Sequence, residues 1–300
     1  MEAIRVNNES RPIREKVTLP YLREMKNRSE VISMLSCYDY PSACFMEEAG
    51  VEIISVGDSL GMTILGYTST LPVTMEVMLP HTRAVRKGSP NAWLIGDMPF
   101  MSYQPSVETA ILNAGRYMAE AECDGVKLEG GIEMLPQIEG IIRSGIPVMG
   151  HLGLRPQSAS ALGGFKLQGK TAYQAKKIID DASALENAGC MAILLEMVPD
   201  RIAQIISENA SIPIIGLGSG PFTDGQLLIY HDMFGLYPRF KPRMAKVFEP
   251  AGELIKRGLK EFVRQVKTSE FPAPENWFGI NDAHFDELKE ILEERQIYHV

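Results

Sequence analysis

A short phrase recurs along this chain, in which an amphipathic stretch ends in a small residue, often glycine, and a short apolar run follows. Examples are EEAG-VEIISV, ECDG-VKLEG, RSGI-PVMGHL, ENAG-CMAILLEM and ENAS-IPIIGLG. A glycine just past a helix suits the left-handed C′ position, and a β-branched run after it is typical of a strand that is buried on both faces. The alternation predicts βα units that are joined by right-handed parallel crossovers.

Eight apolar runs have the length of strands: Val31–Cys37, Ile53–Gly57, Trp93–Gly96, Val126–Leu128, Pro147–Gly150, Ala192–Leu195, Pro213–Leu217 and Leu227–Tyr230. Helical patterns follow most of them: Ser42–Ala49, Glu76–Arg86, Val107–Cys123, Glu133–Ser144, Tyr173–Ala188, Ile202–Asn209 and Glu253–Val266. Only Ser219–Gln226, between the last two strands, is too short for a full helix. Eight strands in 300 residues favour one closed (β/α)₈ barrel, with a doubly wound open sheet as the alternative.

Three segments follow from this count. Residues 1–30 form a polar N-terminal arm with a short helix near Leu22–Asn27, and residues 31–270 form the barrel. Residues 271–300 form a C-terminal extension, in which the spacing of apolar residues predicts a helix over Asn281–Gln296. The prolines at positions 272 and 274 mark the linker before that helix.

Composition excludes several classes of protein. The net charge of −8 argues against an interface that neutralises phosphates, so nucleic acid is not an expected partner. No apolar run approaches the ~18 residues of a membrane helix, and residues 1–20 lack the apolar core of a signal peptide. The four cysteines show no CxxC spacing, which favours reduced thiols and a cytoplasmic protein. They are Cys37, Cys44, Cys123 and Cys190.

Ionisable or small polar residues close almost every predicted strand. They are Tyr38-Asp39, Asp58-Ser59, Asp97, Lys127 with Glu129, His151, Glu196, Gly218-Ser219 and His231-Asp232. Catalytic groups of a (β/α)₈ barrel stand at these ends, although any one of them is about as often the first solvated residue of a loop. Because such residues follow seven strands, the solvated-loop explanation does not account well for the whole set.

Several carboxylates at one barrel mouth would repel one another, so they need compensating positive charge. Lys127 supplies one charge, and an oxygen-binding divalent cation such as Mg²⁺ is the natural further source. No HExxH, HxxxH or cysteine cluster offers a zinc site instead. Spacing alone leaves open which carboxylates bind the metal and which one acts as a base.

Two glycine-rich stretches are weaker signals. Gly163–Lys170 lacks the spacing of a phosphate-binding loop and favours a mobile lid. Gly216–Gly220 lies where many barrels bind phosphate, but its glycines would equally allow a tight strand exit. Ser59 has no GxSxG elbow around it, so we interpret it as a hydrogen-bond donor to substrate rather than a nucleophile.

Seven colinear motifs between about Val31 and Phe248 resemble the ketopantoate hydroxymethyltransferase family. They are Val56–Met62, Ser69–Thr74, His81–Val85, Asp97–Met101, Val126–Gly131, Gly150–Leu154 and Thr223–Gln226. The resemblance implies a (β/α)₈ barrel of the phosphoenolpyruvate/pyruvate superfamily type. It also implies hydroxymethyl transfer from 5,10-methylenetetrahydrofolate to 3-methyl-2-oxobutanoate on the way to pantothenate and coenzyme A. Mg²⁺ and a homo-oligomer, such as a decamer built from pentamers, are implied as well.

The resemblance also implies roles for single residues. Asp58 and Asp97 match metal ligands that also meet the substrate, and Glu129 matches a carboxylate that completes the metal shell through water. Ser59 and Lys127 match groups that hold the 2-oxo acid. Glu196 matches the proton acceptor, and His151 matches a histidine that lines the substrate pocket.

The chain departs from the family pattern in loops, at Tyr67, Thr68, Arg155, Ser219 and Pro242. These positions put the choice of 2-oxo acid in question more than the type of reaction. A lyase or mutase of the same superfamily is one alternative, although 165–171 lacks the loop cysteine typical of that group. A non-catalytic barrel that only binds a ligand is another alternative.

Overall fold

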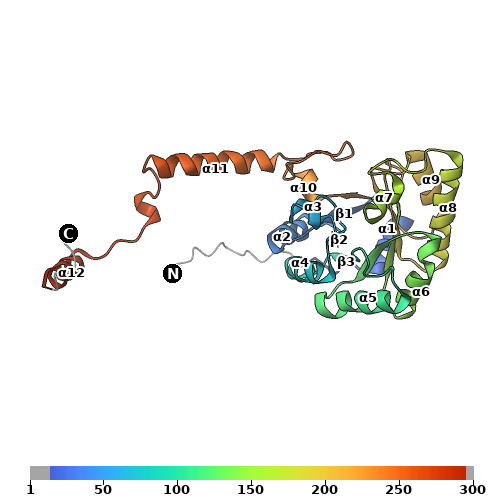
Figure 1. Ribbon diagram of the computed structural model, residues 1–300, viewed down its shortest axis with the longest axis horizontal. Helices are drawn as coiled ribbons and strands as arrows, with labels where there is room; N and C mark the ends of the chain where they lie inside the picture. Colours follow the sequence, from blue (N-terminus) through green and yellow to red (C-terminus); the bar gives the residue numbers. More distant parts are fainter. Residues whose placement is uncertain (1–13, 295–300) are drawn as a thin grey trace. The chain divides into compact units, whose positions relative to one another are not determined.

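Eight parallel strands close into one barrel in the computed structural model, which describes residues 14–294 (Figure 1). The strands are β1 (Ile32–Ser36), β2 (Ile53–Val56), β3 (Trp93–Asp97), β4 (Gly125–Glu129), β5 (Val148–Gly153), β6 (Ala192–Glu196), β7 (Ile214–Leu217) and β8 (Gly225–Leu228). Their order around the barrel follows the sequence, and β8 closes it by pairing with β1. The predicted barrel is therefore confirmed, and each predicted strand overlaps an observed one.

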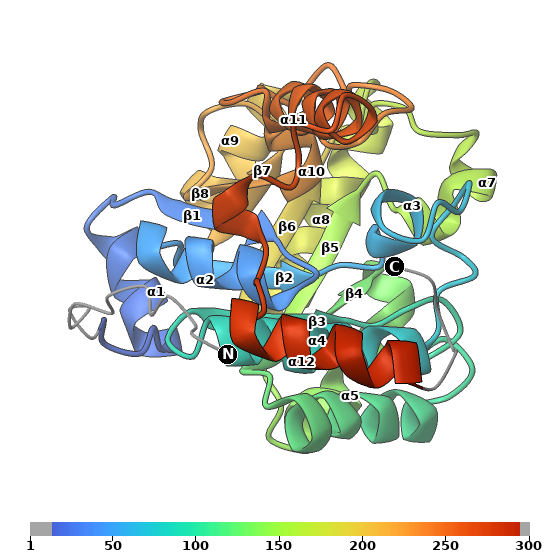
Figure 2. The same ribbon diagram turned by 90° about the vertical axis from the view of Figure 1, so that its left-hand side faces the viewer.

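The helices of the barrel region are α1 (Leu19–Asn27), α2 (Tyr40–Ala49), α3 (Leu60–Thr63), α4 (Met75–Gly88), α5 (Val107–Ala121), α6 (Leu135–Arg143), α7 (Ala159–Leu162), α8 (Ala172–Asn187), α9 (Asp200–Asn209) and α10 (Tyr230–Met233). Helices α4, α5, α6, α8 and α9 pack on the outer face of β2 to β7 (Figure 1 and Figure 2). No helix separates β7 from β8, as the short interval predicted.

The chain divides into two compact units, with the boundary between Glu249 and Pro250. The second unit contains α11 (Ala251–Lys267), which overlaps the helix predicted over Glu253–Val266, and α12 (Asp282–Glu294), which overlaps the helix predicted over Asn281–Gln296. The first thirteen residues of the predicted N-terminal arm, and the end of the predicted last helix at 295–296, lie outside the described residues. The predicted domain limits of 31–270 stay a prediction.

The interior of the barrel is apolar at its N-terminal end. One buried cluster joins inward side chains of the strands, such as Ile53 and Ile95, to Leu22 and Met25 of α1 and to Val17. A second cluster lies between the strands and the outer helices. Because the helix α1 and the apolar interior close one end, the space for a ligand lies at the C-terminal ends of the strands.

The glycines of the recurring phrase take two different roles. Gly50, Gly145 and Gly189 have positive φ angles of 82°, 84° and 94°, as expected of residues that end a helix. The same expectation is wrong for Gly125, which is the first residue of β4, while Glu122 takes the left-handed position with φ 53°. A Cβ at Gly125 would lie 2.9 Å from the carbonyl oxygen of Pro147, so close strand packing explains this glycine.

Candidate active site

The polar site is the next layer of side chains above the apolar barrel interior. Successive residues of a strand point to opposite faces, so the residue two positions after an inward apolar side chain also points inward. This rule relates Ile95 to Asp97, Met149 to His151, and Leu194 to Glu196. The second residue of each pair is buried but polar, so the strand ends face a shared space rather than solvent.

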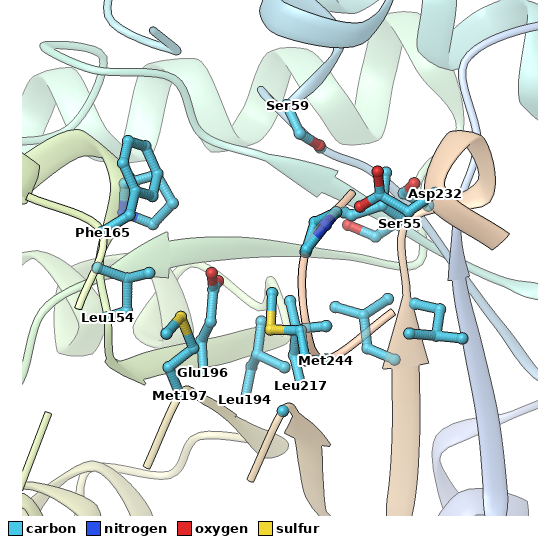
Figure 3. A pocket seen from close by; sticks show the side chains of 18 of the residues that line it. Ser55, Ser59, Leu154, Phe165, Leu194, Glu196, Met197, Leu217, Asp232 and Met244 are labelled. Atoms are coloured by element: carbon cyan, nitrogen blue, oxygen red, sulfur yellow. The ribbon is translucent and has the colours of Figure 1, made fainter. Parts of the chain in front are cut away.

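A cavity of about 1330 Å³ opens at this layer, and all seven predicted site residues line it. They are Asp58, Ser59, Asp97, Lys127, Glu129, His151 and Glu196. Figure 3 shows Glu196 and Ser59 directed into the same space from different strand ends, with Leu154, Phe165 and Leu217 around them. The structure thus brings the whole predicted set together, whereas the role of each member remains a prediction.

Asp97 and Lys127 form the central ion pair of the cavity. Register places them opposite each other on β3 and β4, and Lys127 Nζ lies 2.7 Å from Asp97 Oδ1. Burial alone would lower the pKa of Lys127, but the charges of Asp97, Glu129 and Asp58 outweigh burial and raise it. Lys127 therefore stays protonated and supplies the fixed positive charge of the site.

Asp58 lies beside this pair at the end of β2. Its backbone N–H donates to Asp97 Oδ2 at 3.3 Å, so the two aspartates are close neighbours. Burial, and after it the charge of Asp97, raises the pKa of Asp58 to about 7. One lysine is therefore too little positive charge to keep all of the buried carboxylates ionised.

His151 stands between the lysine and Glu196. Lys127 Nζ lies 3.4 Å from Nδ1 of His151, and Nε2 lies 3.2 Å from Oε2 of Glu196, although the latter alignment falls short of a hydrogen bond. Burial, together with the charges of Lys127 and Arg155, holds the pKa of His151 well below its usual value. The ring is thus neutral, and because an ammonium only donates, Nδ1 accepts and Nε2–H faces Glu196.

Two glutamates also belong to the acidic lining. Burial raises the pKa of Glu196 to about 8, against the opposing charge of Lys127. Burial and the charge of Asp58 raise the pKa of Glu129 well above its ordinary value. A carboxyl group with a pKa near the working pH can accept a proton and return it, which suits acid–base chemistry.

Gln157 is a site residue that the sequence did not single out. It is buried, and its Nε2 donates to Asp58 Oδ2 and to the carbonyl oxygen of Met98, both at 2.9 Å. Its backbone N–H donates to Glu129 Oε2 at 3.1 Å, and its Oε1 accepts from the hydroxyl of Tyr103 at 2.9 Å. It lies in a short 3₁₀ helix, Pro156–Ser158, six residues after His151, and no periodicity marks such a position, so only the fold could reveal it.

The hydroxyl of Ser59 has a partner other than a catalytic base. Ser59 Oγ and the hydroxyl of Tyr38 lie 2.7 Å apart, and burial raises the pKa of Tyr38 to about 12. A tyrosine with that pKa stays protonated and does not activate a serine. The arrangement supports the interpretation of Ser59 as a polar contact for a ligand.

Two aspartates of the cavity could bind Mg²⁺, but the part of the chain that the structure describes does not offer a complete coordination shell. Within residues 14–294, no group of three or more His, Cys, Asp or Glu side chains is arranged to hold a metal ion. Mg²⁺ is commonly held by one or two carboxylates, with water and substrate oxygens in the remaining positions. Asp58 and Asp97 match that requirement, and their repulsion at close range is relieved by a cation.

The residues that depart from the family pattern lie in different parts of the structure. Thr68 and Pro242 line the cavity, while Ser219 is fully buried and its Oγ donates to the carbonyl oxygen of Leu195 at 2.7 Å. Arg155 pairs with Glu133 outside the cavity lining. The glycines beside Ser219, at 218 and 220, have φ angles of 65° and 84°, which is the tight exit that the sequence left open.

Several known proteins are similar in sequence to this chain over most of its length. The family model for ketopantoate hydroxymethyltransferase matches residues 16–274. A 3-methyl-2-oxobutanoate hydroxymethyltransferase of Carboxydothermus hydrogenoformans is 50% identical over 88% of this chain and 96% of its own. An enzyme of the same name from Clostridium botulinum (strain Loch Maree) is 49% identical over 90% of this chain and 98% of its own.

Solved structures agree on the fold. A 2,3-dimethylmalate lyase, a member of the PEP mutase/isocitrate lyase superfamily, has a TM-score of 0.55 at 12% identity, covering 95% of this chain and 98% of the lyase. Among the described residues, no helix is long and apolar enough to cross a membrane. The match of family model and relatives over nearly the whole barrel shows that this chain belongs to the ketopantoate hydroxymethyltransferase family.

Proposed function

We propose that this chain transfers a hydroxymethyl group from 5,10-methylenetetrahydrofolate to 3-methyl-2-oxobutanoate and releases ketopantoate and tetrahydrofolate. The observation that carries the proposal is that one cavity holds both a buried lysine–aspartate ion pair and a separate glutamate whose pKa burial raises to about 8. The lysine of the ion pair can bind an anionic 2-oxo acid, and the glutamate can remove a proton from that acid. The identity of the two substrates is inferred from membership of the family.

Lys127 and Ser59 would hold the substrate. The ammonium of Lys127 is protonated and buried, so it attracts the carboxylate and the keto oxygen of a 2-oxo acid. Asp58 and Asp97 would hold Mg²⁺, with Glu129 contacting it through water. When bound, Mg²⁺ supplies Lewis acidity that stabilises negative charge on the keto oxygen.

Glu196 would act as the general base. Its carboxylate accepts the proton from C3 of the acid, and the electron pair of the broken C–H bond moves into the enolate. The neutral ring of His151 lies beside this carboxylate, with Nε2 3.2 Å from Oε2 of Glu196. The enolate carbon then bonds to the methylene carbon of the folate, and water supplies the hydroxyl oxygen as both C–N bonds of that methylene group break. The two folate nitrogens take up the proton that Glu196 removed and one proton of the water.

The direct test is incubation with 3-methyl-2-oxobutanoate, Mg²⁺ and methylenetetrahydrofolate, followed by detection of ketopantoate. Exchange of the C3 proton with D₂O, measured without folate, tests the enolate step by itself. Exchange without ketopantoate would indicate a different donor or acceptor, such as that of a lyase. A chain with neither reaction would be a ligand-binding barrel.

Asp97→Ala tests the metal assignment. The substitution removes one ligand and also leaves Lys127 unpaired, so Mg²⁺-dependent binding of the 2-oxo acid should be lost. Circular dichroism and thermal unfolding would show whether the variant folds. Unchanged Mg²⁺ titration in a folded variant would remove Asp97 from the ligand set.

We also propose a cytoplasmic homo-oligomer. All four cysteines are free thiols, which accords with a reducing compartment. Helix α11 exposes large apolar side chains, including Leu259 and Phe262, as an assembly surface would. Sedimentation velocity of the purified chain measures the oligomeric state, and a monomer would refute this part of the proposal.

A further inference from the structure

We propose that the segment Tyr237–Phe248, where the cavity meets solvent, binds the anionic glutamyl tail of the folate co-substrate. The inference rests on the proposed function, because it assigns a subsite to that co-substrate. Seven residues of this segment line the same cavity as the buried acidic cluster. They are Tyr237, Phe240, Pro242, Arg243, Met244, Lys246 and Phe248.

Charge is distributed unevenly along the cavity. The segment carries four basic residues and no acidic one, in a chain with a net charge of −8. The deep end holds several carboxylates, and its one lysine is paired with Asp97. Arg243 and Lys246 are exposed, and neither forms an ion pair with a carboxylate of the described residues. These two cations are therefore free to bind an anion from solution.

The cavity is large enough for a second, longer ligand. Its volume of about 1330 Å³ exceeds the about 300–1,000 Å³ typical of small-molecule pockets. A small branched 2-oxo acid that reaches Lys127 and Glu196 leaves most of that space empty. A ligand that presents its reactive end to the acidic cluster and its anionic end to Arg243 and Lys246 would span the remainder. Folate, with its fused ring at one end and glutamyl carboxylates at the other, has this distribution of charge.

The segment also offers apolar surface for the middle of such a ligand. The rings of Tyr237 and Phe240 meet edge to face at 5.2 Å between centroids, and both line the cavity. Lys246 Nζ lies 4.6 Å from the centre of the Phe248 ring. Aromatic rings bind planar groups, and the ammonium beside one of them remains available to a carboxylate.

Arg239 attaches this segment to the loop after α3. Its guanidinium donates to the carbonyl oxygens of Gly66 and Tyr67, at 2.7 Å and 3.3 Å. Arg239 does not line the cavity, so its part is to hold the segment in place. The cationic side chains thus stand on a fastened segment rather than a free loop, which lowers the entropic cost of binding.

Kinetics with two donors test the assignment. The variants are Lys246→Glu, the double change Arg243→Glu with Lys246→Glu, and Lys241→Glu as the control. Lys241 is an exposed lysine of the same segment that does not line the cavity, so its reversal changes the net charge equally. The donors are methylenetetrahydrofolate with one glutamate and with three. Each KM is measured at low and at high salt.

We expect the wild-type chain to favour the triglutamate donor at low salt. The double variant should raise the KM of the triglutamate donor by about tenfold and that of the monoglutamate donor by less. Lys241→Glu should leave the ratio of the two KM values unchanged. High salt should weaken the preference in the wild type and have little effect on the double variant.

Two results would overturn the assignment. One is a ratio of KM values that stays at the wild-type level in the double variant. The other is an equal change in Lys241→Glu and Lys246→Glu, because that would reflect the overall field of the protein rather than a subsite. Failure of the proposed function is distinguishable, because the wild-type chain would then form no ketopantoate with either donor.

Discussion

Gln157 and Asp58 are 99 positions apart in the sequence, yet the amide Nε2 of the first donates to Oδ2 of the second at 2.9 Å. The same glutamine binds Glu129 through its backbone N–H. One residue of the loop after β5 thus orients two carboxylates of the acidic cluster. This hydrogen bond to Asp58 also lowers the pKa of Asp58, against the larger effect of burial.

Replacing Gln157 with Met, which has a similar shape, should therefore raise the pKa of Asp58 further. More of Asp58 would be protonated at neutral pH, so the acidic limb of the pH–activity profile should move to higher pH. The unpaired buried carboxylate should also lower the free energy of unfolding by about 1–3 kcal/mol. Gln168→Met is the control, because the side-chain amide of Gln168 donates to the nearby carbonyl oxygen of Lys166 and Gln168 lies outside the cavity lining. An unchanged pH profile in Gln157→Met would show that Gln157 does not tune the site.

Glu196→Gln should bind the 2-oxo acid but no longer exchange its C3 proton with D₂O. An amide has nearly the shape of the carboxylate but cannot accept the proton, and loss of a general base costs about 10²–10⁴-fold in rate. NMR of the substrate in D₂O measures the exchange. Glu208→Gln on the exposed face of α9 is the matched control and should exchange normally. Normal exchange in Glu196→Gln would exclude Glu196 as the base.

Without metal, the folded chain should lose stability as the pH rises. The pKa values of Asp58 and Glu196 are raised by burial to about 7 and about 8, while unfolded carboxyl groups titrate near pH 4. Between these values the folded state binds protons that the unfolded state has released, so unfolding becomes easier with rising pH. In EDTA, the free energy of unfolding should fall by about 5 kcal/mol between about pH 5.5 and about pH 8.

Denaturant titrations at several pH values measure this slope. Glu196→Gln should have a shallower slope, because it removes one of the titrating groups. Mg²⁺ should stabilise the wild-type chain more at the higher pH, where the carboxylates are ionised. Stability that rises with pH in EDTA would contradict the assignment of raised pKa values to these groups.

Gly153→Ala should disrupt the position of Glu196. Gly153 has a φ angle of 87°, and a Cβ there would lie 2.2 Å from the backbone oxygen of Glu196. Gly145→Ala is a matched control, because its φ angle is 84° and nothing lies within 4 Å of its Cβ position. Gly145→Ala should cost about 1–2 kcal/mol through its backbone angle alone, and Gly153→Ala should cost at least about 1–3 kcal/mol more. Equal costs from chemical denaturation would show that the contact with Glu196 is relieved without strain.

Much of the site could be predicted because strand ends are local features. An apolar run followed by Asp97 or Glu196 is visible in the sequence, and a parallel barrel brings all such ends to one face. The same periodicity explains why the eight strands and the short interval before β8 were predicted. Asp97, His151 and Glu196 meet in one cavity through this regular geometry.

The side-chain contacts that the sequence could not predict depend on strand register and on the connections between strands. The ion pair of Asp97 and Lys127 follows from the pairing of β3 with β4, and Gln157 reaches Asp58 from a short 3₁₀ helix in the connection after β5. The sequence by itself determined the barrel class and the chemical types at its mouth, because hydrophobic periodicity and strand ends are set by neighbouring residues. Only the tertiary structure decided which of these groups touch, since side-chain contacts between distant segments depend on strand stagger and loop path.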